Sequence, residues 1–375
     1  MDKVMIPFID VQAQRQRLGS KIDDAIAKVL NHGIFIGGPE VVELEGKLAE
    51  FGNVANCISC ANGTDALQLV LMAEGVGPGD AVFVPAFTFV ASGEVVPPTG
   101  ASLVLVDVQP DTFLIDPSSL EYAIEDARRA GLRPRMVIAV DLFGLPAEYD
   151  VLQSIVDRHD MTLVADAAQS FGATYKGRPV GCLADYTTTS FFPAKPLGCY
   201  GDGGAIFTDN SEKTSILRSL CVHGKGDYKY DNVRIGINSR LDTIQAAVLL
   251  EKLAIFPEEI EARQEVAARY DAGLSDIIVV PTFPVHATSA WAQYTVKIKG
   301  RDEVQARCKD VGVPTVVYYP LALNQQVGYR DVRVVVSGVT VSENLCSQVL
   351  SLPMHPYLDR ATQNKVIECL RQSLL

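Results

Sequence analysis

The strongest constraint on the fold is the stretch between residues 55 and 210, where short apolar runs alternate with longer segments of helical periodicity. Continuous apolar runs of this length are typical of strands buried on both faces, and their alternation with amphipathic helices indicates a mainly parallel sheet. The runs lie at residues 57–60, 81–84, 103–106, 136–140, 162–165, 187–192 and 205–208. The sequence therefore predicts an α/β domain with a mainly parallel seven-stranded sheet and helices on both faces. Ligands of such sheets bind at the carboxyl ends of the strands.

The rest of the chain predicts further elements. Residues 1–50 have a helical pattern with glycine-rich breaks, and residues 241–256 and 257–274 predict two consecutive helices. Beyond Pro281, strand-like segments at 293–298 and 315–319 mix with a helix at 301–311. A chain of 375 residues is long for one core, so two domains are expected. We predict an N-terminal segment with the large α/β domain at 1–250, and a small α+β domain at 251–375.

The charge balance limits the partners of this chain. With 33 basic and 45 acidic residues the net charge is −12, which argues against a nucleic-acid or anionic membrane surface. A small anion remains possible, because the N–H groups at the start of a helix can bind phosphate. No stretch approaches the roughly 20 apolar residues of a membrane span, and the N-terminus lacks the apolar core of a signal peptide. We expect a cytoplasmic protein.

The eight cysteines are scattered, and Cys57 and Cys60 form the one CxxC pair. A zinc site of this type needs a second pair, and a redox pair would normally open a helix, whereas this one lies inside an extended apolar run. The sequence therefore predicts reduced core cysteines and no metal site.

Lys195 has an unusual setting. The apolar run at 187–192 ends just before it, prolines stand on both sides at 193 and 196, and a glycine-rich turn follows. The prolines resist continuation of a regular element, and the glycines allow close backbone approach. A lysine held at the edge of a buried strand can lose its proton and act as an amine nucleophile toward a carbonyl. A solvated loop lysine is the alternative.

Three further segments follow or end strands of the same predicted sheet. Gly63 and Thr64 open a helix, which makes either an anion site or a plain capped helix. Asp166 ends an apolar strand, where it is either paired with a cation or caps a helix. Ser190 lies on the strand leading to Lys195. An amine, a carboxylate for a ring nitrogen and donors for a phosphate are together the parts of a pyridoxal 5'-phosphate (PLP) site.

In these segments the chain resembles, along nearly its full length, the DegT-type nucleotide-sugar aminotransferases, which are PLP enzymes of fold type I. The matching segments are GTDAL at 63–67, DAAQ at 166–169, SFFP at 190–193 with Lys195, and NSRLD at 238–242. The resemblance implies that Lys195 forms the Schiff base with PLP and that Asp166 pairs with the ring nitrogen. It further implies that Gly63, Thr64 and Ser190 hold the phosphate, that Phe89 stacks on the ring, and that Gln169 approaches the ring near its hydroxyl.

The same resemblance implies a homodimer with shared active sites, in which Asn238 reaches the phosphate of the other subunit's cofactor. Arg240 is then a candidate clamp for a carboxylate, with a structural ion pair as the alternative. The basic loop beginning at His223 is a candidate for contact with the nucleotide diphosphate, or a solvated loop. Transamination of this type takes the amino group from L-glutamate and gives it to a UDP-ketosugar.

Within the family, the sequence is most similar to enzymes that aminate UDP-2-acetamido-3-keto-hexoses, including the 3-keto-glucuronate form used for bacterial surface polysaccharide or lipopolysaccharide (O-antigen). The KPLGCYGD segment at 195–202 carries this similarity. One departure matters: the uronate enzymes typically have His-Tyr-Pro where this chain has Tyr318, Tyr319 and Pro320. Both tyrosines are candidate substrate contacts, and an uncharged 3-keto-GlcNAc nucleotide remains an acceptor beside the uronate.

Other functions remain as alternatives. A 4-ketosugar acceptor fits the same family, and a non-catalytic regulatory relative is a different class of protein. The sugar dehydratases of this fold replace the lysine with histidine, and Lys195 argues against that activity. The glycines at 201–204 precede a strand instead of opening a helix, which argues against a dinucleotide-binding oxidoreductase.

Overall fold

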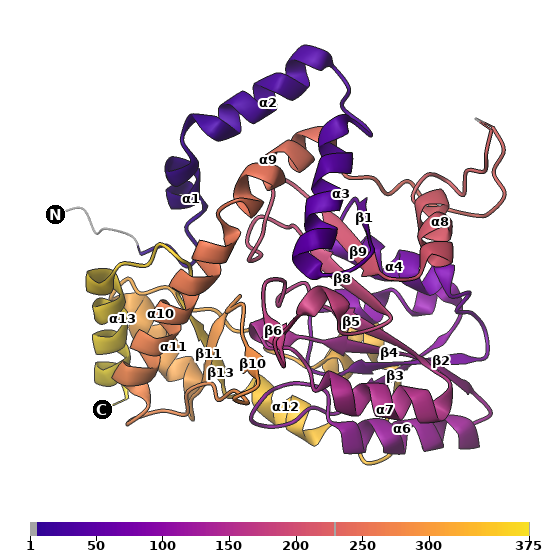
Figure 1. The fold of residues 1–375 in the computed structure, drawn as a ribbon. Coiled ribbons are helices and arrows are strands. Elements are labelled where there is room, and N and C mark those ends of the chain that lie inside the picture. Colours follow the sequence, from indigo (N-terminus) through magenta and orange to yellow (C-terminus); the bar gives the residue numbers. More distant parts are fainter. Residues whose placement is uncertain (1–5, 229, 375) are drawn as a thin grey trace.

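The computed structural model describes residues 6–228 and 230–374, and its centre is the large sheet that the apolar runs predicted (Figure 1). The strands from these runs are β1 (Asn56–Cys60), β2 (Asp80–Pro85), β3 (Ser102–Val106), β4 (Arg133–Val140), β5 (Thr162–Asp166), β8 (Tyr186–Ser190) and β9 (Gly204–Thr208). Within the described residues the sheet has eight strands in the order β1-β9-β8-β5-β4-β2-β3-β12. The eighth, β12 (Arg333–Val334), is a two-residue edge strand beside β3 that the sequence did not predict.

The mainly parallel sheet is confirmed, since among its described strands β9 alone runs in the direction opposite to all the others. Connections between parallel strands are right-handed, so connections that run in opposite directions across the sheet place their helices on opposite faces. Helices α6 (Pro117–Arg129) and α7 (Tyr149–His159) therefore cover one face, and α4 (Gly63–Ala73) covers the other together with α8 (Ser211–Leu220) (Figure 1). All the parallel strands consequently end at one edge, where the functional site forms.

Helices outside the sheet surround this domain. The N-terminal region forms α1 (Val11–Leu18), α2 (Ser20–His32) and α3 (Pro39–Gly52), with the predicted break between α2 and α3. Gly33 ends α2 in the left-handed conformation, which glycine adopts at little cost. The two predicted consecutive helices are α9 (Thr243–Leu253), which packs beside α2 and α3, and α10 (Phe256–Leu274).

The C-terminal part builds a second hydrophobic cluster from α10, α13 (Arg360–Ser373) and the antiparallel pair β11 (Tyr294–Lys297) and β13 (Val349–Leu352). Helix α11 (Arg301–Asp310) packs against α13. Helix α12 (Thr340–Cys346) instead contributes to the first hydrophobic cluster, which is the core around the large sheet. A small sheet joins β6 (Thr174–Tyr175), β7 (Arg178–Pro179) and β10 (Ala287–Thr288).

One predicted element is wrong. Residues 315–319 do not form a strand, because the segment makes only an isolated bridge between Val316 and Ser351 before it enters the site. The domain boundary at residue 250 stays a prediction, and the chain after it contributes to both hydrophobic clusters.

All the cysteines except half-buried Cys182 are core residues. Cys57 and Cys60 are buried in β1, and all eight cysteines are free thiols. Among the described residues, no group of three or more His, Cys, Asp or Glu side chains is placed to hold a metal ion. No described helix is long and apolar enough to cross a bilayer.

His355 is a buried histidine, 2% exposed, in the segment that connects β13 to α13. Burial lowers its pKa to about 4, and the nearby Asp10 carboxylate opposes that shift only in part. Because the folded-state pKa lies below the ordinary value, the unfolded chain takes up a proton first as the pH falls. The stability contribution of neutral His355 is therefore present above pH 6.5 and is lost as the pH falls toward 4.

We predict that His355→Leu reduces the acid sensitivity of the fold. Between pH 7 and pH 5, the free energy of unfolding of the unsubstituted protein should fall by roughly 2 kcal/mol more than that of the variant. Urea denaturation at both pH values measures the difference. Equal falls in the two proteins would show that His355 does not control this part of the pH dependence.

Candidate active site

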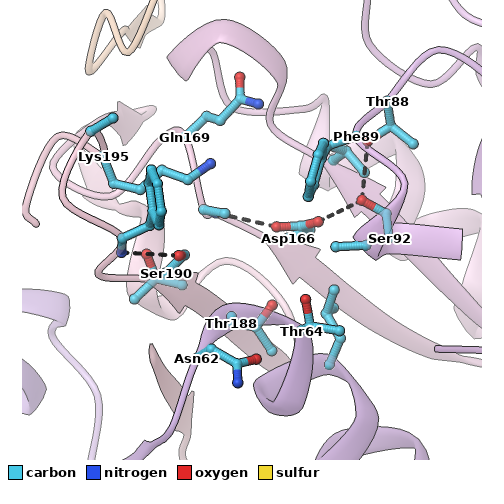
Figure 2. Close-up of a pocket in the computed structure, with 18 of the residues that line it drawn as sticks. Asn62, Thr64, Thr88, Phe89, Ser92, Asp166, Gln169, Thr188, Ser190 and Lys195 are labelled. Carbon is cyan, nitrogen blue, oxygen red and sulfur yellow. Dashed lines mark hydrogen bonds between the residues drawn. The ribbon is translucent and has the colours of Figure 1, made fainter. Parts of the chain in front are cut away.

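A cavity of about 610 Å³ opens at the carboxyl ends of β5 and β8 (Figure 2). Its lining comes from segments far apart in the sequence, which the parallel sheet brings to one edge. The described lining residues are Ile9, Asn62, Gly63, Thr64, Asp65, Leu67, Thr88, Phe89, Ala91, Ser92, Val140, Asp166, Ala168, Gln169, Thr188, Thr189, Ser190, Phe192, Ala194, Lys195, Asp202, Gln293, Tyr318 and Tyr319.

Most of the predicted site residues meet in this cavity. Those that line it are Gly63, Thr64, Phe89, Asp166, Gln169, Ser190, Lys195, Tyr318 and Tyr319. Asn238, Arg240 and His223 do not line it and belong to a separate segment between α8 and α9.

The start of α4 forms one wall of the cavity. The Asn62 side chain caps the helix by accepting from the Asp65 N–H at 2.7 Å, and the helix begins at Gly63. A Cβ atom on Gly63 would lie 2.8 Å from Ser190 Cβ, so only glycine lets this helix end meet the end of β8 so closely. The first N–H groups of a helix lack partners within it, and here they lie beside the Ser190 and Thr64 hydroxyls. This wall suits a phosphate group.

Asp166 ends β5 as a buried carboxylate, 7% exposed. It accepts hydrogen bonds from Ser92 Oγ at 2.7 Å and from the Ala168 N–H at 3.2 Å. Burial raises the pKa of Asp166, and the hydrogen bond from Ser92, the backbone bond and the charge of Lys195 counteract this shift only in part. A positive charge facing the carboxylate would compensate for its burial, so the site suits a protonated ring nitrogen.

Lys195 extends from the loop after β8 into the same space as Asp166 (Figure 2). Its backbone N–H donates to Phe192 O at 2.8 Å. Burial lowers the pKa of Lys195, and the Asp166 carboxylate opposes the shift. The amine therefore loses its proton more readily than a surface lysine does, as a nucleophile requires.

Gln169 is fixed by two contacts. Its Oε1 accepts from the Phe143 N–H at 2.6 Å, and its Nε2 donates to the Tyr319 hydroxyl at 3.3 Å. Phe89 reaches the cavity from the other side, 51% exposed, with its ring 6.1 Å from that of Tyr319. A flat ring seated between the lysine and the carboxylate would have this aromatic face beside it (Figure 2).

The segment before α9 presents two polar side chains away from the cavity. Ser239 is fully buried, and its hydroxyl accepts from the Ala61 N–H at 3.1 Å. Its neighbours are more accessible: Asn238 is exposed, and half-buried Arg240 donates to the Asn238 side-chain oxygen. His223 lies in the adjoining hairpin, where its N–H donates to Ile237 O at 2.9 Å.

The charge of the cavity is unusual for a phosphate site. Among its described lining residues, Lys195 is the one basic side chain, beside the acidic side chains of Asp65, Asp166 and Asp202. An anionic ligand with several negative charges would therefore need basic groups from outside this lining.

The sequence analysis missed two supporting features. Thr88 and Ser92 hydroxyls lie 3.0 Å apart and form a chain that ends on Asp166. Asp141 follows β4 directly, and it accepts from Ser170 Oγ at 2.6 Å and Tyr149 OH at 2.7 Å. Burial raises the pKa of Asp141 to about 7. The rule that located Asp166, a polar residue at the end of a buried strand, would also have located Asp141.

These residues fit PLP. The glycine-lined start of α4 with Ser190 would hold the phosphate, buried Asp166 would face the ring nitrogen, and Lys195 would reach the aldehyde carbon. Gln169 and Phe89 would line the edge and face of the ring.

Comparison with known proteins agrees with this geometry. The model of the DegT/DnrJ/EryC1/StrS aminotransferase family matches residues 16–371. The chain is 50% identical to UDP-2-acetamido-2-deoxy-3-oxo-D-glucuronate aminotransferase of Pseudomonas aeruginosa, over 96% of this chain and 97% of the relative.

Solved structures are similar over the whole fold. A DegT/DnrJ/EryC1/StrS aminotransferase from Brucella abortus superposes with a TM-score of 0.97 at 50% identity, covering 98% of this chain and 99% of that one. The PLP form of Spr1654 from Streptococcus pneumoniae has a TM-score of 0.90 at 26% identity, with 99% and 98% covered.

We predict that Gly63→Ala weakens PLP binding by about tenfold or more, because the new methyl group would push the start of α4 away from Ser190. Titration of the apoprotein with PLP, followed by visible absorbance, measures the dissociation constant. Gly46→Ala is the matched control, since its Cβ would meet nothing within 4 Å on the exposed side of α3. A dissociation constant unchanged by Gly63→Ala would contradict the assignment of the phosphate wall.

Proposed function

Because this chain belongs to the DegT/DnrJ/EryC1/StrS aminotransferase family, we propose that it transfers the amino group of L-glutamate to C3 of a UDP-linked 2-acetamido-3-keto sugar. It is a PLP-dependent nucleotide-sugar aminotransferase. The observation that carries the acceptor is the 50% identity, over nearly the whole chain, to an enzyme named for a 3-oxo-glucuronate nucleotide. The acceptor is this uronate or the uncharged 3-keto-GlcNAc.

PLP, when bound, supplies an electron-accepting ring that stabilises negative charge on the carbon attached to the transferred nitrogen. In our proposal the chain provides the remaining functions. Asp166 keeps a proton on the ring nitrogen, since a buried carboxylate is stabilised by a facing cation. The first turn of α4 and Ser190 anchor the phosphate.

Lys195 is the proposed catalytic acid and base. Its Nζ accepts the proton that the Cα of glutamate releases and later delivers a proton to C3 of the sugar. The lowered pKa of Lys195 favours the first step, because the amine must be neutral to accept a proton. Gln169 and Tyr319, held together by their hydrogen bond, would fix the edge of the ring so that the reacting carbon faces Lys195.

We further propose a homodimer in which each site is completed by a second copy of the chain. The shortage of basic side chains in the cavity supports this, because a phosphate, a diphosphate and the carboxylates of glutamate need cations. Asn238 is exposed and Arg240 is half-buried beside the anchored Ser239, and the same segment exposes the apolar side chains of Val233 and Ile235. His223 in the same hairpin is the proposed diphosphate contact.

Arg240 is our candidate for binding a carboxylate of the acceptor or of the donor. Tyr318 lines the cavity at the position where the uronate enzymes typically have histidine. Its hydroxyl can donate to a carboxylate or to a sugar hydroxyl. This substitution is the reason for keeping both 3-keto sugars as acceptors. We assign the reaction to the cytoplasmic synthesis of a bacterial surface polysaccharide or lipopolysaccharide.

To identify the acceptor, the PLP-loaded protein is first given glutamate, so that the cofactor carries the amino group, and the remaining glutamate is then removed. We expect UDP-3-keto sugars to restore the spectrum of the PLP form, with their 3-amino products identified by mass spectrometry. Paired substrates with and without the C6 carboxylate rank the uronate against 3-keto-GlcNAc. Reaction with UDP-4-keto sugars alone would replace the C3 assignment, and no amine transfer from glutamate to any of them would favour a regulatory protein.

The shared site predicts complementation between two inactive variants. Lys195→Ala and Asn238→Ala should each be inactive or nearly so alone, whereas a hybrid dimer keeps one site with both native residues. Unfolding and refolding the variants together should restore roughly one quarter of the native activity, since half of the dimers are hybrids with one intact site each. Lys195→Ala mixed with itself is the control. A mixture without activity would contradict sharing of the site.

A further inference from the structure

We propose that Lys252 and Gln245, two residues of α9 outside the cavity, are positioning residues that hold the loop carrying Lys195 in its reactive place. The inference rests on the proposed role of Lys195 as the cofactor lysine. Neither side chain lines the cavity, so both would act through the loop.

The loop between β8 and β9 is held mainly at its base, where the Phe191 N–H donates to Gly203 O at 2.7 Å; near the lysine, the Lys195 N–H donates to Phe192 O at 2.8 Å. The Cys199 N–H donates to Phe191 O at 2.7 Å and closes the base of the loop. Pro193 and Pro196 on either side of the lysine have no N–H to donate. A loop of this kind needs contacts from neighbouring elements to fix its tip.

Helix α9 supplies two such contacts. Lys252 Nζ donates to Gly198 O at 2.7 Å, and Gln245 Oε1 accepts from the Tyr200 N–H at 2.8 Å. The two residues are seven positions apart, about two helical turns, so they lie on the same face of α9. Lys252 Nζ also lies 4.2 Å from the centre of the Tyr200 ring, within the range of a cation–π contact.

Gly198 packs closely against the backbone that precedes Lys195. A Cβ atom at Gly198 would lie 2.6 Å from Phe192 O and 2.7 Å from Pro193 O, so the turn has no spare room. A shift of Gly198 would therefore move the residues that immediately precede the lysine. Misplacement of a reacting group by about 1 Å can reduce a rate by about two orders of magnitude.

A structural role alone is a poor explanation for a lysine at this position. Lys252 is 0% exposed, and within the described chain it forms no ion pair with a carboxylate. Burial lowers its pKa to about 8. An apolar side chain of similar volume would fill the space without the cost of burying an amine. Such a side chain could not donate a hydrogen bond to the Gly198 carbonyl, as Lys252 does.

The test measures how fast Lys195 captures PLP. Apoprotein is mixed with PLP, samples are reduced with borohydride at successive times, and mass spectrometry of peptides gives the labelled fraction of Lys195. In the unsubstituted protein, PLP on Lys195 supports the proposed cofactor lysine. PLP on a different lysine would overturn that proposal, and this inference with it.

We expect Lys252→Met to slow capture by Lys195 by about tenfold or more, with a melting temperature close to that of the unsubstituted protein. Gln245→Leu, which removes the second contact, should also slow capture and serves if Lys252→Met fails to fold. Arg263→Met is the matched control. Arg263 is also a buried cation, 5% exposed, and it donates to a backbone carbonyl, Trp291 O, at 2.9 Å; this carbonyl is not part of the Lys195 loop. It should change stability without slowing capture.

Capture at the native rate in folded Lys252→Met, or in Gln245→Leu if Lys252→Met does not fold, would overturn the inference. Equal slowing in Arg263→Met and Lys252→Met would also overturn it, because the effect would then follow from the loss of any buried cation.

Discussion

The partial or complete withdrawal of two opposite charges from water, at one edge of a parallel sheet, determines most of this site. Asp166 is buried and Lys195 is half-buried, and this loss of water raises the pKa of the carboxyl group and lowers that of the amine. Each group alone would destabilise the fold, and together they create a space that favours a cationic ring nitrogen and a reactive aldehyde carbon. The hydroxyls of Ser92 and Thr88 hold the carboxylate in place. This pair therefore suits a ring with a protonated nitrogen and a neighbouring aldehyde carbon.

The remaining parts of the site are arranged around this pair by packing. Gly63 lets the start of α4 approach Ser190, which sets the phosphate wall at a fixed distance from the lysine loop. Helix α9 connects two parts of the proposed mechanism: its inner face contacts the loop of Lys195, and the Asn238–Arg240 segment before it points outward. One helix could thus fix the cofactor lysine of one subunit and the residues that complete the site of the other.

Much of the large domain was predictable, because strands buried on both faces leave continuous apolar runs in the sequence. All seven runs became strands, and polar residues at or after the ends of β1, β2, β5 and β8 meet in one cavity. The two-residue strand β12 was not predictable, since so short a segment carries no periodicity. Residues 315–319 have strand-like composition, yet they turn toward the cavity and place Tyr318 and Tyr319 there. Tertiary contacts overrode local preference in that segment.

The sheet, the family and the grouping of Lys195, Asp166 and Ser190 were all visible in the amino-acid sequence, because they depend on local pattern and on order along the chain. Three features became visible only in the folded chain: the pKa shifts of Asp166 and Lys195, the contact that makes Gly63 necessary, and the separation of the segment with Asn238, Arg240 and His223 from the cavity. The burial of Lys252 and its contact with the Gly198 carbonyl were likewise visible only in the fold, because in sequence Lys252 is one lysine on a helix. Burial and distance arise from contacts between segments far apart in the chain, and no local pattern records them.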